Sequence, residues 1–214
     1  MKTTNKLLTL IIIFSSLFSL QSQNKFSKRK IENLKDEVSQ LVEDDKKMTQ
    51  VMIDKVFSFG ELGFQEFETS KYLGKILEEN GFDVEYQISG IPTSWLATWS
   101  NGEGGPTIAL GSDFDGVPST SQYPGVAYEK PVVEGAPGHG EGHNIGLPIV
   151  ITSAIAIKKI MIENNINGKL VLWPGVAEEI LGAKAWYVRD GYFDNVDMLS
   201  LIHISEPTRL QAIS

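Results

Sequence analysis

Cysteine is absent from the 214 residues of the chain, and histidine occurs only three times. Without cysteine the protein can form no disulfide, no thiolate nucleophile and no zinc-finger site. It also cannot be a lipoprotein of the usual bacterial kind. Any metal site must therefore use histidine, aspartate and glutamate as ligands.

Basic residues are outnumbered, because 19 lysines and arginines face 27 aspartates and glutamates, for a formal net charge of -8 and a pI of about 4.9. This balance argues against nucleic acid or an anionic membrane surface as the main partner. The composition, 42% hydrophobic and 21% charged, is that of a globular protein. The length allows one good-sized domain, or one domain with an incomplete second. We find no internal repeat and no low-complexity linker.

Long apolar runs are rare, and the one at the N-terminus indicates export. Lys2 and Lys6 precede an almost unbroken apolar stretch from residue 7 to 20. The stretch has roughly the length of a signal peptide and is too short for a comfortable membrane span. We therefore predict a signal peptide at residues 1–23 and an exported protein, periplasmic or secreted, with no membrane attachment after cleavage.

Downstream, helical and strand patterns alternate. Apolar spacing and Gly or Asn stops predict helices at 28–57 (one or two), 66–80, 147–163 and 182–189. Apolar or alternating runs bounded by turn residues predict strands at 83–88, 94–99, 107–111, 169–173 and from 197 onward. The alternation predicts an α/β fold with a mostly parallel sheet flanked by helices. Functional sites in such folds lie in the loops that follow the carboxyl ends of strands.

The first candidate site is the pair Asp113 and Asp115, directly after the strand at 107–110. A turn at Gly116 could bring both carboxylates to one ion. The alternative is ordinary turn chemistry, since Asp before Gly is common in turns. A calcium loop fits poorly, because the residues after Gly116 lack oxygen ligands at the required offsets.

The second candidate is residues 138–146, which hold His139, Glu141 and His143 among closely spaced glycines. Imidazole and carboxylate together suit a metal such as zinc, and glycines let the backbone fold tightly. We expect a helix to begin just afterwards, with Asn144 as its N-cap. The alternative is a Gly-rich surface loop. The helical two-histidine signature of zinc proteases is excluded, because glycines disfavour a helix here.

The third candidate is the pair Glu178 and Glu179, after the strand at 169–173. One carboxylate could hold a metal while the other acts as general base. The alternative is two solvated residues that favour the start of a helix.

These motifs occur in an order that resembles metallopeptidase family twenty, the amidohydrolase group of aminoacylase and aminobenzoyl-glutamate hydrolase. The similarity covers roughly residues 48–198 and is carried by residues 60–64, Glu66, 80–82, 111–115, 138–144, 177–179 and 182–184. It implies a hydrolase of amide or peptide bonds with two divalent metal ions, an α/β catalytic domain and an inserted dimerisation domain. Residues 24–198 would then be an incomplete, zinc-peptidase-like catalytic domain.

The resemblance also implies roles for individual residues. Glu178 would be the general base, and Glu141, His143, Glu179 and Asp115 would be metal ligands. Glu141 stands where many members carry a ligating cysteine, which makes the site harder and leaves zinc, manganese or cobalt open. Asp113 replaces a histidine ligand of the peptidase branch, and His139 has the least specific match of the group.

The last 16 residues, 199–214, match the translation of a transposase-type sequencing adapter over residues 199–209 and 213–214. We expect this tail to be non-native and native sequence to end near Met198. His203 lies near where the family has a metal ligand, but by this argument it is not one. The dimerisation insert and a final histidine ligand would be missing, so we expect the chain as written to be an inactive, truncated part of its parent.

The sequence thus predicts a parent enzyme that hydrolyses an N-acyl amino acid or small peptide by metal-activated water. Glu178 would move the proton, and the parent would be a homodimer. The alternative is a non-catalytic relative that binds metal or peptide on the same scaffold.

Overall fold

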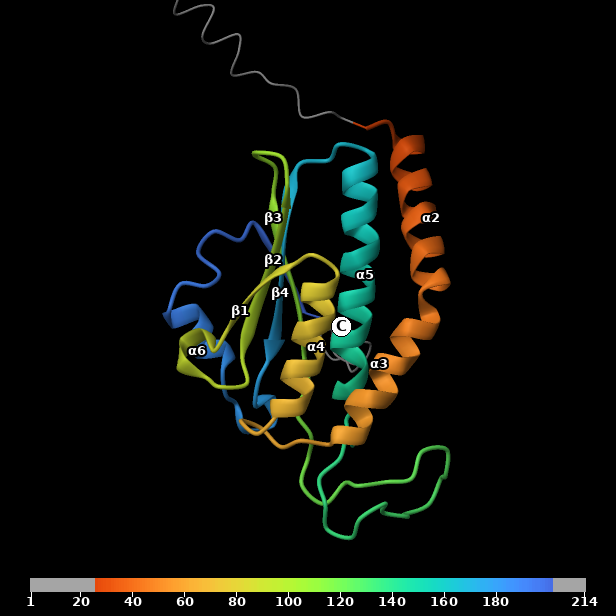
Figure 1. Ribbon diagram of the computed structural model, residues 1–214, viewed down its shortest axis with the longest axis vertical. Coiled ribbons are helices and arrows are strands. Elements are labelled where there is room, and N and C mark those ends of the chain that lie inside the picture. Colours follow the sequence, from red (N-terminus) through yellow and green to blue (C-terminus); the bar gives the residue numbers. More distant parts are fainter. Residues whose placement is uncertain (1–25, 202–214) are drawn as a thin grey trace, which may run out of the picture. The chain divides into compact units, whose positions relative to one another are not determined.

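The computed structural model describes residues 26–201 (Figure 1). The chain divides into two compact units, Met1–Asp36 and Glu37–Ser214, and helix α2 (Lys28–Asp44) runs across the division. All other helices and strands described below belong to the second unit. The predicted signal peptide at 1–23 lies outside the described residues, as do residues 202–214 of the predicted tail, including His203. Residues 199–201 of that tail are described and belong to strand β5 (Met198–Leu201).

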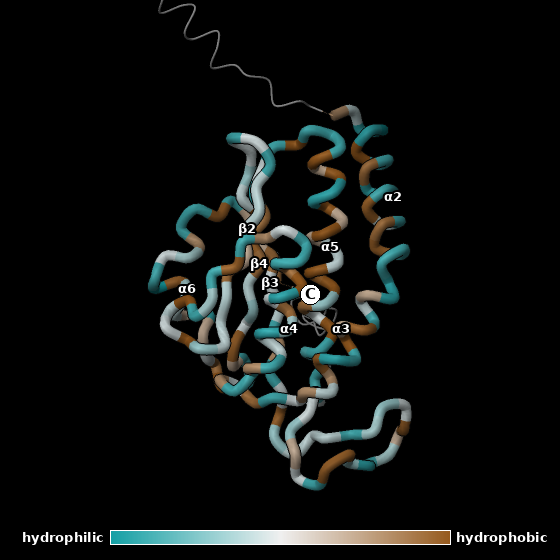
Figure 2. The backbone as a smooth tube through the Cα atoms, in the orientation of Figure 1, coloured by the Kyte–Doolittle hydropathy of each residue, from teal (hydrophilic) through white to brown (hydrophobic). Residues whose placement is uncertain are grey.

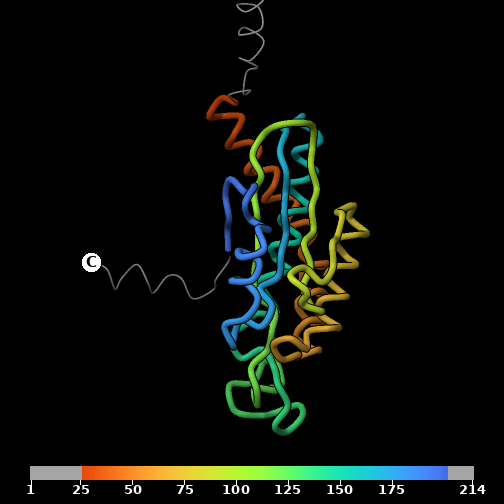
Figure 3. Tube along the Cα trace, turned by 90° about the vertical axis from the view of Figure 1, so that its left-hand side faces the viewer, coloured from red at the N-terminus to blue at the C-terminus, as the bar shows by residue number. Residues whose placement is uncertain are grey.

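The second unit is built on a five-stranded sheet with the order β1-β2-β4-β3-β5. In Figure 3 the strands lie side by side, with the blue trace of β4 between the green traces of β2 and β3. The strands are β1 (Asp83–Tyr86), β2 (Trp95–Asn101), β3 (Thr107–Asp113), β4 (Gly168–Gly175) and β5 (Met198–Leu201). Strand β4 is central, as its continuous apolar run from Leu170 to Trp173 predicts for a strand covered on both faces.

The α/β class is confirmed, and the sheet is mixed rather than mostly parallel. Strand β3 pairs in parallel with β4 and β5, whereas β2 pairs antiparallel with β1 and β4. The reason is connection length. The link from β1 to β2 is short and contains the 3₁₀ turn η1 (Ile88–Gly90), which allows only antiparallel neighbours. Helical crossovers after β3 and β4 permit the parallel pairs.

The helices are α3 (Lys46–Phe59), α4 (Phe67–Glu79), α5 (His143–Glu163) and the short α6 (Lys184–Arg189). Figure 1 shows α4 and α5 on one side of the strands and α6 on the other. The predicted helical region at 28–57 is two helices that meet at Asp45. Our N-cap assignment for α5 is wrong, since the helix begins at His143 and Asn144 is its second residue. Gly142, with φ of 91°, is the N-cap, because a left-handed backbone there costs glycine little.

Helix α5 is the centre of the hydrophobic core. It is apolar along most of its length (Figure 2) and packs against α3, β3 and β4. It is long and apolar enough to cross a membrane by length and composition. Its buried positions, among them Leu147, Ile151 and Ala154, instead join the core that includes Leu172 of β4. The pattern is that of a buried core helix.

Strands β3 and β4 end at the same edge of the sheet. Their parallel register pairs Ser112 with Pro174 and Asp113 with Gly175. The residues that follow each strand therefore leave the sheet side by side. This register brings the first and third sequence motifs together.

Candidate metal centre

The long connection from β3 to α5 is closed at its base by backbone pairing. The N–H of Val117 donates to the carbonyl of Gly138 over 2.8 Å, and the N–H of Gly138 donates back over 3.1 Å. Gly116 also donates to the carbonyl of Glu61 over 2.7 Å, and a Cβ at Gly116 would lie 2.8 Å from the Gly138 oxygen. This close approach requires glycine. It places the residues around Asp115 beside the start of the second motif.

Four predicted site residues come together at this edge of the sheet. One ligand atom from each of Glu141, His143, Glu178 and Glu179 lies within 4.8 Å of the others. Glu141 belongs to the loop before α5, His143 is the first residue of α5, and the two glutamates begin the 3₁₀ turn η2 (Glu178–Ile180). Glu141 is exposed and the other three are partly buried. Three carboxylates and one imidazole form a donor set suited to zinc, manganese or cobalt.

The orientation of His143 fits a metal ligand. Its Nδ1 lies 3.1 Å from the backbone carbonyl oxygen of Asp115. Because a carbonyl oxygen only accepts, Nδ1 carries a hydrogen, and Nε2 is the ring nitrogen that can bind a metal once it has lost its proton. Nε2 is 3.8 Å from Oε2 of Glu141. Metal-binding histidines commonly donate their second ring N–H to a backbone carbonyl in this way.

The electrostatics of the cluster call for a cation. Burial lowers the pKa of His143, but the Asp115 carboxylate, with the charge of Asp113, outweighs burial and raises the pKa to about 9. Burial and the nearby Glu141 carboxylate raise the pKa of Glu179. The Oε1 atom of Glu179 is buried, and none of residues 26–201 donates a hydrogen bond to it. Crowded carboxylates of this kind are stabilised when a divalent ion lies between them.

Asp115 lies beneath the cluster and is not one of its four members. Its carboxylate is fully buried, and Oδ2 accepts the backbone N–H of Glu179 over 3.1 Å. Its Oδ1 is 3.4 Å from Nδ1 of His143. Asp115 therefore contacts two members of the cluster, one through each carboxylate oxygen.

Asp113 forms an ion pair with Lys184, a residue for which the sequence predicted no role of its own. The Nζ of Lys184 lies 2.8 Å from Oδ1 and 3.0 Å from Oδ2 of Asp113, and 3.8 Å from Oε1 of Glu178. Burial raises the pKa of Asp113, and the Lys184 ammonium opposes that rise. The sequence signal for this ion pair was the position of Lys184, near the start of the helix predicted at 182–189 and shortly after Glu178 and Glu179.

His139 forms its hydrogen bond with a residue outside the cluster. The ring is buried, and its Nε2 donates to the backbone carbonyl of Val56 over 3.1 Å. Burial lowers the pKa of His139 to about 4, so the ring is neutral at pH 7. The group of four does not include it.

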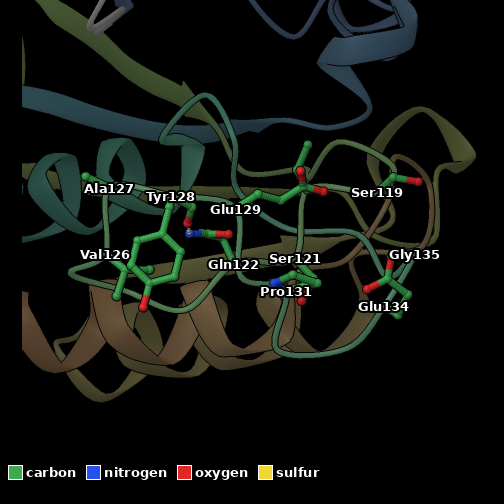
Figure 4. A pocket seen from close by; sticks show the side chains of 11 residues that line it. Ser119, Ser121, Gln122, Val126, Ala127, Tyr128, Glu129, Pro131, Glu134 and Gly135 are labelled. Atoms are coloured by element: carbon green, nitrogen blue, oxygen red, sulfur yellow. Dashed lines mark hydrogen bonds between the residues drawn. The ribbon is translucent and has the colours of Figure 1, made fainter.

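A separate hollow of about 480 Å³ lies within the β3–α5 connection, between residues 119 and 135 (Figure 4). Its lining includes Tyr128, Glu129 and Glu134. The side chain of Gln122 crosses the loop, donating to the carbonyl of Tyr128 over 2.7 Å and accepting the N–H of Lys130 over 2.8 Å. None of the predicted site residues lines this hollow.

Known proteins share both sequence and fold with the chain. It is 32% identical over 160 residues to one of the subunits of the p-aminobenzoyl-glutamate hydrolase of Escherichia coli, covering 75% of this chain and 33% of that protein. It is 32% identical over 139 residues to the hippurate hydrolase of Campylobacter jejuni, covering 64% of this chain and 33% of that protein. The chain thus spans about one third of the length of these curated relatives.

A solved structure supports the fold. The YXEP protein of Bacillus subtilis, a dinuclear metal-binding peptidase from the M20 family, superposes with a TM-score of 0.61 at 23% identity. The match covers 74% of this chain and 44% of that one. No family model matches the chain. The structural likeness shows that the sheet and helices have the fold of an M20 peptidase.

Proposed function

We propose that this chain is the metal-binding part of an M20-type hydrolase that cleaves the amide bond of an N-acyl amino acid or small peptide. The observation that carries the proposal is the convergence of Glu141, His143, Glu178 and Glu179 within 4.8 Å. The named activities of the relatives, hydrolysis of p-aminobenzoyl-glutamate and of hippurate, support the substrate class. Because the chain spans about one third of those relatives, the activity is proposed for the whole protein.

We assign two roles to the residues of the site: some would bind the metal, and one would transfer a proton. Glu141, His143 through Nε2, and Glu179 would hold divalent metal, and Asp115 would keep His143 and Glu179 in place. We propose two ions, zinc in the first instance, with manganese or cobalt as the alternatives. Such ions supply Lewis-acid activation of a water and of the scissile carbonyl.

Glu178 is the proposed general base. Its Oε1 is 3.8 Å from the ammonium of Lys184, and its side chain remains partly open to solvent. A general base acts as the carboxylate, which is the form that accepts a proton. Glu178 would take the proton from the attacking water and pass it to the leaving amine.

Kinetics of a Glu178→Gln variant in the full-length protein test this assignment. General-base catalysis contributes roughly 100- to 10,000-fold, so we expect kcat on N-acyl amino acids to fall by at least about 100-fold. Zinc affinity should stay within a few fold, because Gln keeps an oxygen donor. The control is Glu129→Gln, which changes an exposed carboxylate outside the cluster. Normal turnover in Glu178→Gln contradicts its role as base. No turnover by the unaltered protein on any acyl amino acid or dipeptide, together with metal binding, favours a non-catalytic binding protein.

We also propose that the protein is exported and acts as a homodimer. Lys2, Lys6 and the apolar stretch that follows support export. Mass spectrometry of the N-terminus of the secreted or periplasmic protein tests it, with a cut near residue 23 as the expected result. The mass of the full-length protein in solution tests the dimer.

A further inference from the structure

Glu66 is a fully buried carboxylate that lies just before α4, far in sequence from the metal cluster. Its Oε2 accepts the hydroxyl of Thr93 over 2.8 Å. Its Oε1 accepts the backbone N–H of Ala177 over 2.9 Å, across a separation of 111 residues. Within residues 26–201, no lysine, arginine or histidine forms an ion pair with it. Burying a carboxylate in this way is costly, so it needs a specific reason.

Ala177, whose N–H Glu66 accepts, begins the turn at residues 177–182 that carries Glu178 and Glu179. We call these residues the catalytic turn. Ala177 directly precedes Glu178, and its φ of 54° is left-handed, which is unfavourable for a residue with a Cβ. Its carbonyl accepts the N–H of Gly182 over 2.8 Å, which closes the turn. Such strained conformations persist only where the surroundings hold them.

Ala177 is tightly packed, and its backbone N–H needs a hydrogen-bond acceptor. A Cβ at Gly63 would lie 2.9 Å from Cα and Cβ of Ala177, and one at Gly182 would lie 2.8 Å from Cβ. The Ala177 side chain is therefore enclosed between two glycines. Its N–H is buried beyond the end of β4, where the sheet supplies no acceptor. A buried backbone N–H without an acceptor is strongly unfavourable.

We propose that Glu66 is a positioning residue for the metal cluster. By accepting the N–H of Ala177, it holds the left-handed turn that aims Glu178 and Glu179 at Glu141 and His143. This inference rests on the proposed function, because it takes the four-residue cluster to be a binding site for a divalent ion. Glu66 is not one of the four residues that could hold the ion.

The test compares two carboxylates of the same loop in the full-length protein. Glu66→Met removes the acceptor at similar size, whereas Glu66→Gln keeps an oxygen for Ala177 and offers an amide to the Thr93 hydroxyl. The matched control is Glu61→Met. Glu61 accepts the N–H groups of Glu68 and Thr69, each over 2.9 Å, and so stabilises the start of α4 without contacting the turn. Glu66→Asp, which retracts the carboxylate by one methylene, replaces Glu66→Met if that variant does not fold.

The first readout is hydrogen exchange of the metal-free protein. In Glu66→Met we expect at least tenfold faster exchange over residues 177–182, with Glu66→Gln close to the unaltered protein. In Glu61→Met the faster exchange should be confined to Glu68 and Thr69. The second readout is the zinc dissociation constant measured by calorimetry. We expect a rise of about tenfold or more in Glu66→Met, as is usual when a residue behind a metal ligand is lost, and less than twofold in Glu61→Met and Glu66→Gln.

The positioning role is overturned if exchange over 177–182 and zinc affinity in Glu66→Met stay within twofold of the unaltered protein. It is equally overturned if Glu61→Met changes both to the same extent. A protein that binds no divalent ion at all contradicts the proposed function. In that case the exchange comparison still decides whether Glu66 holds the turn.

Discussion

The ammonium of Lys184 lies within 3.0 Å of both carboxylate oxygens of Asp113, which is almost completely buried. Asp113 ends strand β3 and Lys184 begins α6, so the pair joins the sheet to the helix that follows the catalytic turn. The ammonium also faces Glu178. The Asp113 carboxylate therefore has a countercharge supplied by the protein.

Removing Lys184 should destabilise the fold. Lys184→Met leaves Asp113 buried without its cation, and breaking a buried ion pair costs about 3 kcal/mol or more. We expect a loss near that lower figure, because the lysine side chain is 30% exposed. Urea denaturation gives the free energy of unfolding. Adding Asp113→Asn should recover about half of the loss, and strictly additive losses in the double variant would count against the pair.

Divalent metal should stabilise the protein through the cluster. At 100 times the dissociation constant, a bound ion adds about 2.7 kcal/mol, or roughly 5–10 °C in Tm for a domain of this size. We expect zinc to raise Tm and a chelator to reverse the change. His143→Ala should abolish the shift, since it removes the one imidazole of the group. An equal zinc-dependent shift in that variant would place the metal elsewhere.

The two histidines of the Gly-rich motif should behave differently. His139→Gln loses a buried contact with Val56 and should lower stability by about 1–3 kcal/mol. Its zinc dissociation constant should change less than threefold. His143→Gln should weaken zinc binding by more than about 100-fold, beyond the usual effect of changes behind a ligand. Calorimetric titration with zinc measures both, and equal losses of affinity would make His139 a ligand.

Gly63 should not tolerate a side chain. A Cβ there meets Ala177 at 2.9 Å, so Gly63→Ala must displace the turn. We expect a loss of about 1–3 kcal/mol in stability together with weaker zinc binding. Gly104→Ala is the control, because a Cβ there meets nothing within 4 Å, although its φ of +74° makes the substitution strained. That variant should lose some stability and keep its zinc affinity. Unchanged zinc affinity in Gly63→Ala would show that the turn adapts.

The sequence alone determined the elements and the residues available for chemistry. The apolar runs at 169–173 and 147–163 predicted a strand and a helix, and β4 and α5 lie at those positions. Glu141, His143 and the pair at 178–179 were identified from the sequence because loops after strand ends carry such side chains. Local sequence patterns show the spacing of apolar residues and the presence of turn-forming residues. Both depend only on residues that are close together in the sequence.

Only the tertiary structure decided how those side chains are used. Asp113 and Asp115 are two residues apart, yet one pairs with Lys184, 71 residues away, and the other lies beneath His143. His139 turns to Val56, 83 residues earlier, and the acceptor for Ala177 comes from Glu66. Each choice depends on which distant group the chain brings within hydrogen-bond distance. No local pattern contains that information, because it arises only when the strands, helices and loops have packed.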